Sequence, residues 1–285
     1  MIPVVSQELD GSGVEMRKGS TVSWVAVLLA AAAPLVTHAQ AARSNRVGGH
    51  PNLNGIWQAM NSANWNLEGH AATQLIDFWR LGAAGGAIPA GQSVVKEGKI
   101  PYRADALAKR EENRAGWPKT DPEAACYLPG IPRATYLPHP FQIVQGDDDI
   151  LFVYSFANAN RAVHMKNHRT IDEVPVDLWM GWSNGRWEGD TLVVEVIAND
   201  GRTWFDRSGN YHSAALKVTE RYTPLDANRI QYEATIDDPD VYTAPWTISM
   251  HLYKNTEPNA ELLEFKCVEF SEHLLYNEFL KEPLP

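Results

Sequence analysis

The sequence predicts a mainly β protein, an antiparallel meander that closes into a β-barrel behind a short helical and irregular N-terminal segment. Residues 180–187 and 191–197 are predicted to pair as two strands on the two sides of a turn at residues 188–190, which is typical of a tight hairpin. Several similar segments follow, joined mostly by short loops and without long helices between them. An antiparallel sheet of this kind most simply closes into a barrel.

The N-terminal region carries the pattern of a secretory signal peptide. A basic region beginning at Met16 precedes an apolar core over residues 22–36 and a small-x-small cleavage pattern at residues 39–41. We therefore predict a signal peptide over residues 1–41 and a periplasmic or secreted protein. Residues 1–15 are polar and acidic, so the start of translation is expected at Met16. A membrane anchor is the alternative, but an apolar run of roughly 15 residues is short for a span that needs about 20.

Charge and motif content narrow the classes of partner. The chain has 35 acidic and 25 basic residues, a net charge of −10, and nucleic acid or an anionic membrane would need clustered Lys and Arg. The sequence also lacks a phosphate-binding glycine loop, a Gly-x-Ser-x-Gly elbow, a Cys-x-x-Cys pair and a His-Glu-x-x-His motif. We expect no nucleic-acid partner, no membrane span after signal cleavage, no cofactor and no metal.

The two cysteines, Cys126 and Cys267, allow only one pairing within the chain. An even count in an oxidising compartment favours a disulfide, which would tie the segment before the sheet to its last predicted strand. The alternative is a nucleophilic thiol with a His partner. Neither Cys lies in a recognisable nucleophile motif, so a disulfide is predicted.

Residues 42–140 are predicted to be a helical and Pro-rich segment that contains the first strand and wraps over the barrel. The strand is expected at residues 52–58, and a helix opened by Pro is expected at residues 101–114. The connector over residues 117–140 is rich in Pro and is predicted to be irregular.

Residues 141–285 are predicted to form the antiparallel β-barrel. Period-two alternation and turn residues place its strands at residues 141–145, 150–156, 161–166, 180–187, 191–197, 215–222, 229–236, 246–253 and 261–268.

Four motifs resemble a widespread family of secreted bacterial proteins with a lipocalin-like architecture. They are Pro-Gly-Ile-Pro-Arg at residues 129–133, MGWSNGRWEGDTLVV at 180–194, Gly-Asn-Tyr-His-Ser at 209–213 and Thr-Glu-Arg-Tyr at 219–222. The resemblance covers roughly residues 50–270 and implies a lipocalin-like barrel and export, but no particular reaction. This chain departs from the family at Trp182, where a His is expected, so any chemistry that depends on that His would be absent here.

Glu220 is the first candidate catalytic residue. Alternation places it on one strand face with Leu216, Val218 and Tyr222, while Lys217, Thr219 and Arg221 occupy the other face. A carboxylate on an apolar face must be hydrogen-bonded or paired, and in a cavity it can act as a general acid or base. The structural alternative is a buried salt bridge to Arg161 or Arg133.

His212 is the second candidate, in a predicted loop where a barrel keeps the mouth of its pocket. With Asp206 or Asp200 orienting one ring nitrogen, the other nitrogen could move a proton near neutral pH. The alternative is a turn histidine that caps a strand end. The predicted catalytic set is therefore His212, Glu220 and Asp206.

A second group of residues is predicted to line the pocket and contact the substrate. Large aromatic rings near strand ends can stack on a flat ligand, phenols can donate hydrogen bonds, and polar side chains can anchor it, although core packing is the alternative for the rings. The predicted residues are Tyr154, Arg161, His164, Trp182, Trp204 and Trp246. His164 and His168 lie four residues apart, but the strand period there does not favour a helical metal site.

Two functional classes agree with these patterns. The first is a cofactor-independent acid–base enzyme of the lyase, isomerase, dehydratase or cyclase type, acting on a hydrophobic, aromatic or polycyclic small molecule in the barrel. The second is a periplasmic or secreted lipocalin-like protein that binds such a molecule without catalysis. Glu220 on an apolar strand face favours the enzyme, although a fold of this type supports both classes.

Overall fold

The structure, a computed structural model, describes residues 46–74 and 87–267. The predicted signal peptide over residues 1–41 lies outside the described residues. Within the described ranges, no helix is long and apolar enough to cross a membrane.

The described part of the chain consists of short strands, two α-helices and two 3₁₀ turns. In chain order these are β1 (Arg46–Val47), β2 (His50–Pro51), β3 (Gly55–Ala59), β4 (Thr73–Gln74), β5 (Ala87–Ile88), α3 (Leu107–Gly116), α4 (Arg133–Tyr136), β6 (Phe141–Gln145), β7 (Asp149–Tyr154), η2 (Phe156–Asn158), β8 (Asn160–His164), η3 (Ile171–Glu173), β9 (Trp182–Glu188), β10 (Thr191–Ile197), β11 (Lys217–Pro224), β12 (Arg229–Asp237) and β13 (Trp246–Lys254).

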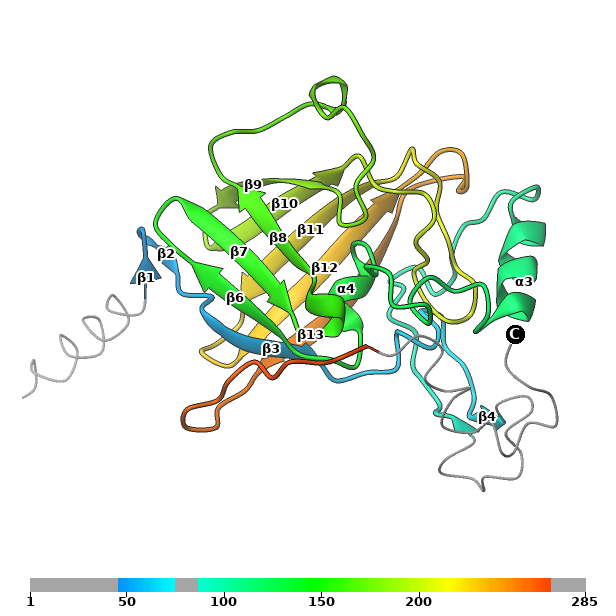
Figure 1. The fold of residues 1–285 in the computed structure, drawn as a ribbon, viewed down its shortest axis with the longest axis horizontal. Helices are drawn as coiled ribbons and strands as arrows, with labels where there is room; N and C mark the ends of the chain where they lie inside the picture. The colour runs from blue at the N-terminus through cyan, green and yellow to red at the C-terminus, as the bar shows by residue number, and fades with distance from the viewer. Residues whose placement is uncertain (1–45, 75–86, 268–285) are drawn as a thin grey trace, which may run out of the picture. The chain divides into compact units, whose positions relative to one another are not determined.

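Nine of these strands form a closed barrel, which confirms the predicted fold class (Figure 1). Their order around the barrel is β10-β11-β12-β13-β3-β6-β7-β8-β9. The arrangement departs from a simple meander in two places. Strand β3 comes from the N-terminal segment and lies between β13 and β6, and β8 pairs with β9 in parallel. The parallel pair arises because the long connection over residues 165–181 carries the chain back before β9 begins.

The prediction of a strand at residues 261–268 is wrong for residues 261–267, which have no regular secondary structure, and residue 268 lies outside the described residues. The last strand, β13, already has β12 on one side and β3 on the other, so the closed barrel offers it no free edge for a further strand.

The segment after β13 crosses to the connection between β7 and β8. There the Ser155 hydroxyl donates a hydrogen bond to the Leu263 carbonyl at 2.8 Å. The Phe265 ring lies 4.1 Å from the ring of His139, which precedes β6. Cys267 then forms the predicted disulfide with Cys126, which closes a sequence separation of 141 residues.

The hairpin expected around the turn after residue 187 is confirmed, with β9 and β10 paired from Thr191 opposite Glu188 to Ile197 opposite Trp182. Gly189 holds φ at +61° in the first position of the two-residue turn. This left-handed conformation strains any residue with a Cβ, so glycine is the favoured residue there.

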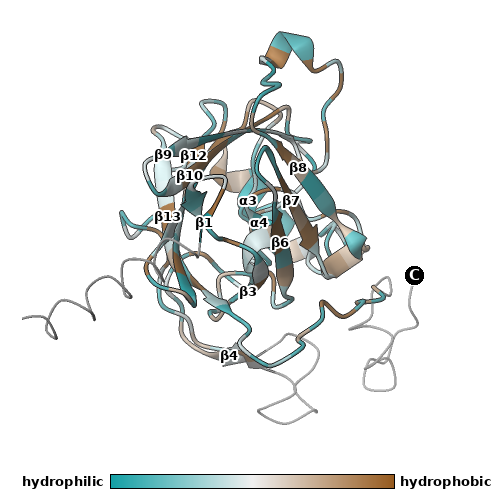
Figure 2. Cartoon of the chain, turned by 90° about the vertical axis from the view of Figure 1, so that its left-hand side faces the viewer, coloured by the Kyte–Doolittle hydropathy of each residue, from teal (hydrophilic) through white to brown (hydrophobic). Residues whose placement is uncertain are grey.

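Alternation along the strands fills the barrel with apolar side chains. On β11, Val218, Glu220 and Tyr222 are buried and their neighbours are not, as the sequence predicts. Brown, apolar stretches run along strands such as β6 and β7, whereas teal, hydrophilic stretches are common in the loops (Figure 2). Ile197 is buried on the outer face of β10 because residues of the connection before β9, among them Val174 and Leu178, pack against it.

Helix α3 overlaps the helix predicted at residues 101–114, whereas helix α4 is not predicted from the sequence. Helix α3 begins at Leu107, six residues after the predicted start, because residues 101–103 instead hydrogen-bond to the backbone of residues 241–243. Helix α4 lies in the connector that was predicted to be irregular. All four of its residues are buried, and it packs against β3.

Candidate functional site

An ion pair between two barrel strands is the centre of the candidate site. The Arg161 guanidinium on β8 donates from Nη1 to Oε2 of Glu220 on β11 at 2.7 Å. Arg161 is 4% exposed and Glu220 is 0% exposed, so both charges are removed from water. They are the only buried charged residues on the described barrel strands. The salt bridge to Arg161 that the sequence offered as the structural role of Glu220 is therefore present.

Two phenols complete the coordination of the carboxylate. The Tyr222 and Tyr232 hydroxyls donate to Oε1 of Glu220 at 2.9 and 2.8 Å, and Arg161 Nη2 donates to the Tyr222 oxygen at 3.0 Å. Burial raises the pKa values of both phenols well above the usual range of tyrosine, and the negative charge of Glu220 acts in the same direction. Both phenols are therefore neutral hydrogen-bond donors at physiological pH.

Three polar atoms beside this network have no hydrogen-bond partner in the described structure. They are the Tyr154 hydroxyl on β7, the Nε of Arg161 and the Thr135 hydroxyl on α4, all of them buried. Burial raises the pKa of Tyr154 to about 12, while the positive charge of Arg161 and close contacts with the Thr135 and Arg161 side chains lower it. Because buried polar groups in native proteins are nearly always paired, this group of three is unusual.

Aromatic rings lie against the same side chains. The Arg161 guanidinium lies over the Phe152 ring at 4.7 Å, and the Phe141 ring lies 5.4 Å from that of Tyr154. The site therefore combines hydrogen-bond donors with flat apolar surfaces.

His212 lies in the predicted loop between β10 and β11, but it is buried and has partners on both ring nitrogens. Its Nε2 lies 2.6 Å from the Thr203 hydroxyl, and its Nδ1 lies 2.8 Å from the Ser213 carbonyl oxygen. Burial lowers the pKa of His212, so the ring is neutral at physiological pH. Among the described residues no hydrogen bond joins His212 to Asp206 or Glu220.

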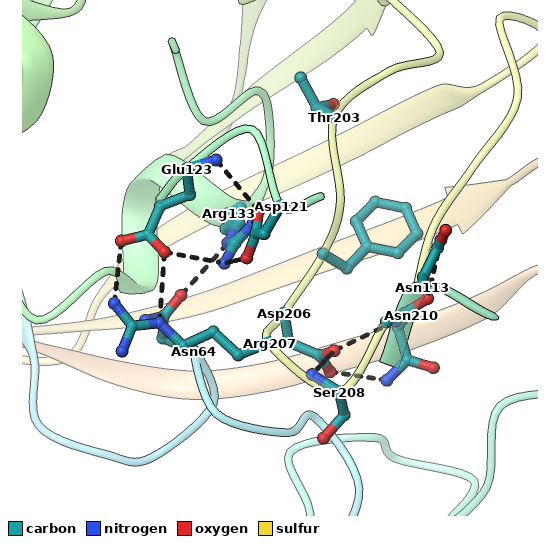
Figure 3. A network of polar contacts seen from close by, with 12 residues as sticks. Asn64, Asn113, Asp121, Glu123, Arg133, Thr203, Asp206, Arg207, Ser208 and Asn210 are labelled. Carbon is teal, nitrogen blue, oxygen red and sulfur yellow. Dashed lines mark hydrogen bonds and ion pairs between the residues drawn. The ribbon is translucent and has the colours of Figure 1, made fainter. Parts of the chain in front are cut away.

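Asp206 is fully buried in the same loop, where it organises backbone (Figure 3). Its carboxylate accepts hydrogen bonds from the backbone amides of Leu67, Ser208 and Asn210 and from the Asn210 side chain. Burial raises the pKa of Asp206 to about 6, although these hydrogen bonds oppose the shift. The other carboxylate considered for His212, Asp200, pairs with Arg202 instead.

Arg133, the alternative partner of Glu220, belongs to a separate buried network (Figure 3). It binds both carboxylate oxygens of Asp121 at 2.8 Å and one oxygen of Glu123 at 3.3 Å. Burial opposes ionisation of Glu123, but Arg207 and Arg133 outweigh it and hold the pKa of Glu123 below its usual range. This network joins the connector to the loop between β10 and β11.

The predicted substrate-binding residues separate into two groups. Tyr154 and Arg161 lie at the Glu220 cluster. Of the other four, the Trp182 ring stacks on His164 at 4.0 Å and Trp246 packs against Phe205 and Tyr242. Trp204 pairs with Tyr211 through a backbone β-bridge. Within the described ranges, no group of three or more His, Cys, Asp or Glu side chains is arranged to hold a metal ion.

Three members of the cluster were not singled out as site residues from the sequence. Tyr222 shares the inward strand face with Glu220, and Tyr232 lies directly opposite Tyr222 in the β11–β12 register, so alternation and strand pairing together could have located both. Thr135 lies on the helix α4, and no local sequence signal points to it.

Comparisons with known proteins identify no relative of this chain. No protein-family model, no curated protein and no solved structure was found to match the chain.

Proposed function

We propose that this chain is an exported protein that binds a small, largely apolar molecule inside the barrel, beside the Arg161–Glu220 ion pair. The observation that carries the proposal is the group of three unpaired, buried polar atoms of Tyr154, Arg161 and Thr135. An unsatisfied buried polar group costs about 1–3 kcal/mol, and a molecule that supplies the missing partner would recover that cost on binding. The Cys126–Cys267 disulfide supports export, because disulfides persist in oxidising compartments.

Binding can be tested on the full chain with 1-aminoanthracene, a neutral fluorophore whose emission rises in apolar surroundings. The proposal predicts saturable binding at one site. It also predicts that Ala234→Leu prevents binding, because Ala234 lies opposite Glu220 in the β11–β12 register and is fully buried. Thr235→Leu is the matched control, since Thr235 is the next residue and occupies the other strand face.

Far-UV circular dichroism and thermal unfolding would show that each variant folds, and Ala234→Val is the milder replacement if Ala234→Leu does not. Absence of saturable binding by the wild-type chain would overturn the proposal. Equal binding by the two leucine variants would place the molecule outside the barrel and would overturn it as well.

An acid–base enzyme is the second candidate, because the Glu220 carboxylate lies within one network with the buried donors of Tyr222 and Arg161. Such a site could remove a proton from carbon beside a carbonyl group and return it. Deuterium incorporation into the methyl group of acetophenone, followed by NMR in D₂O, tests this candidate. Exchange above the buffer rate that Glu220→Gln removes would support it, and exchange at the buffer rate would rule it out for this probe.

A further inference from the structure

The chemistry of the unpaired atoms restricts what the barrel can bind, provided that the proposed binding function holds. The Nε of Arg161 can only donate a hydrogen bond, while the hydroxyls of Tyr154 and Thr135 can donate or accept. All three belong to side chains that are at least nine-tenths buried, with exposures of 4%, 3% and 0%. A partner that satisfies the guanidinium must therefore be a hydrogen-bond acceptor, and the hydroxyls can turn their protons toward the same atom.

The charge balance of the cluster decides between a neutral and an anionic acceptor. Arg161 and Glu220 bring one positive and one negative charge into contact at 2.7 Å. No other charged residue on the described barrel strands is buried. An anionic guest would leave one uncompensated negative charge in a desolvated interior, and burial of an unpaired charge costs far more than burial of a neutral dipole. A neutral oxygen acceptor avoids this cost.

The surroundings of the donors favour a carbonyl attached to an aromatic or other flat apolar group. Phe141 and Phe152 contact the Tyr154 and Arg161 side chains, with ring and guanidinium separations of 5.4 and 4.7 Å. Planar groups pack well against such rings.

We infer that the barrel selects ligands that present a neutral carbonyl oxygen to Tyr154, Arg161 and Thr135, with an apolar, aromatic body against Phe141 and Phe152. Glu220 then acts as a positioning residue: it fixes the guanidinium through Nη1 and leaves Nε directed to the ligand.

Three probes of similar size separate the possibilities: acetophenone, which has a carbonyl, ethylbenzene, which has none, and benzoate, which carries a charge. Each competes with 1-aminoanthracene for the full-length chain near pH 7. We expect acetophenone to compete roughly tenfold better than ethylbenzene, which is the value of about one additional hydrogen bond with a charged donor. Benzoate is expected to compete least.

Tyr154→Phe removes one donor with little change in shape, and it should reduce the preference for acetophenone over ethylbenzene roughly fivefold while leaving the affinity for ethylbenzene unchanged. Thr135→Val is the second variant, with the same expected direction. Tyr253→Phe is the matched control, because Tyr253 is 41% exposed on β13 and should not affect the preference.

The outcomes distinguish the inference from the proposed function. Equal competition by acetophenone and ethylbenzene would overturn the inference and leave an apolar binding protein. Competition that is strongest with benzoate would overturn it in favour of an anion site. Failure of 1-aminoanthracene itself to bind would instead overturn the proposed function.

Discussion

Replacing Glu220 by glutamine tests the energetic role of the buried ion pair. The variant leaves the Arg161 guanidinium, 4% exposed, without its counter-charge. Removal of one partner from a buried pair costs about 3–5 kcal/mol, because the remaining charge is uncompensated in a desolvated interior. In a domain of this size, 1 kcal/mol corresponds to about 2–4 °C in Tm, so a decrease on the order of 10 °C is expected.

Glu195→Gln is the matched control for this experiment. Glu195 lies on the outer side of β10 and pairs with Lys217 at 2.8 Å, and the Lys217 side chain is 49% exposed. Such a surface pair contributes about 0–1 kcal/mol. Urea unfolding followed by tryptophan fluorescence gives the free energy of unfolding of both variants, and the slope against urea shows whether the compared states are the same.

A double variant separates the charge from the packing. Adding Arg161→Met to Glu220→Gln removes the unpaired charge, so the double variant should regain most of the stability that Glu220→Gln loses. If Glu220→Gln destabilises the protein no more than Glu195→Gln does, then the pair is hydrated and the description of the barrel interior is wrong.

Three further predictions concern the loop and connector that surround the barrel. Because burial raises the pKa of Asp206 to about 6, the folded state binds a proton at this carboxyl more readily than the unfolded state. The stability contributed by the protonated Asp206 is complete below about pH 4 and is lost as the pH rises through 6. Urea titrations of Asp206→Asn should therefore show roughly 2–3 kcal/mol less pH dependence between about pH 4 and pH 8. Replacement of Cys126 and Cys267 by serine opens the loop of 141 residues that the disulfide closes. The free energy of unfolding should fall by up to about 5 kcal/mol. A loss below about 1 kcal/mol would show that the disulfide constrains the unfolded chain little. Arg133→Met leaves the buried Asp121 carboxylate without its bidentate partner, so thermal unfolding should show a loss of about 3–5 kcal/mol, and wild-type stability would indicate that water reaches this network.

The barrel could be predicted from the sequence because it rests on local signals. The strand-forming residues at 191–197 and the turn at Gly189 identify the central hairpin without knowledge of any other strand. The position of β3 between β13 and β6 depends on pairings between distant segments, so the pattern shows that β3 is a strand but not where it pairs. The segment at residues 261–267 reads as a strand by its alternation, but the closed barrel leaves it no edge.

The candidate site was predictable only in part, for the same reason. Alternation places Glu220 and Tyr222 on the inward face of β11. The sequence left Arg161 and Arg133 as alternative partners of Glu220, and only the folded chain shows that the partner is Arg161. His212 and Asp206 were predicted at a pocket mouth, and the structure places both in the expected loop but buried among their own hydrogen-bond partners. Those partners include the Thr203 hydroxyl and the Leu67 amide, which only the folded chain brings into contact with them. Their predicted catalytic roles stay predictions.

The infrared stretching frequency of the acetophenone carbonyl, recorded while the molecule is bound to the full chain, tests the central claim most directly. Hydrogen bonds to the oxygen weaken the C=O bond, so donation by Arg161 and Tyr154 predicts a frequency lower than that of acetophenone in an alkane. The shift should decrease in Tyr154→Phe and stay unchanged in Tyr253→Phe. A bound carbonyl that absorbs at the alkane frequency would show that the unpaired donors of the barrel do not contact the ligand and would contradict the account.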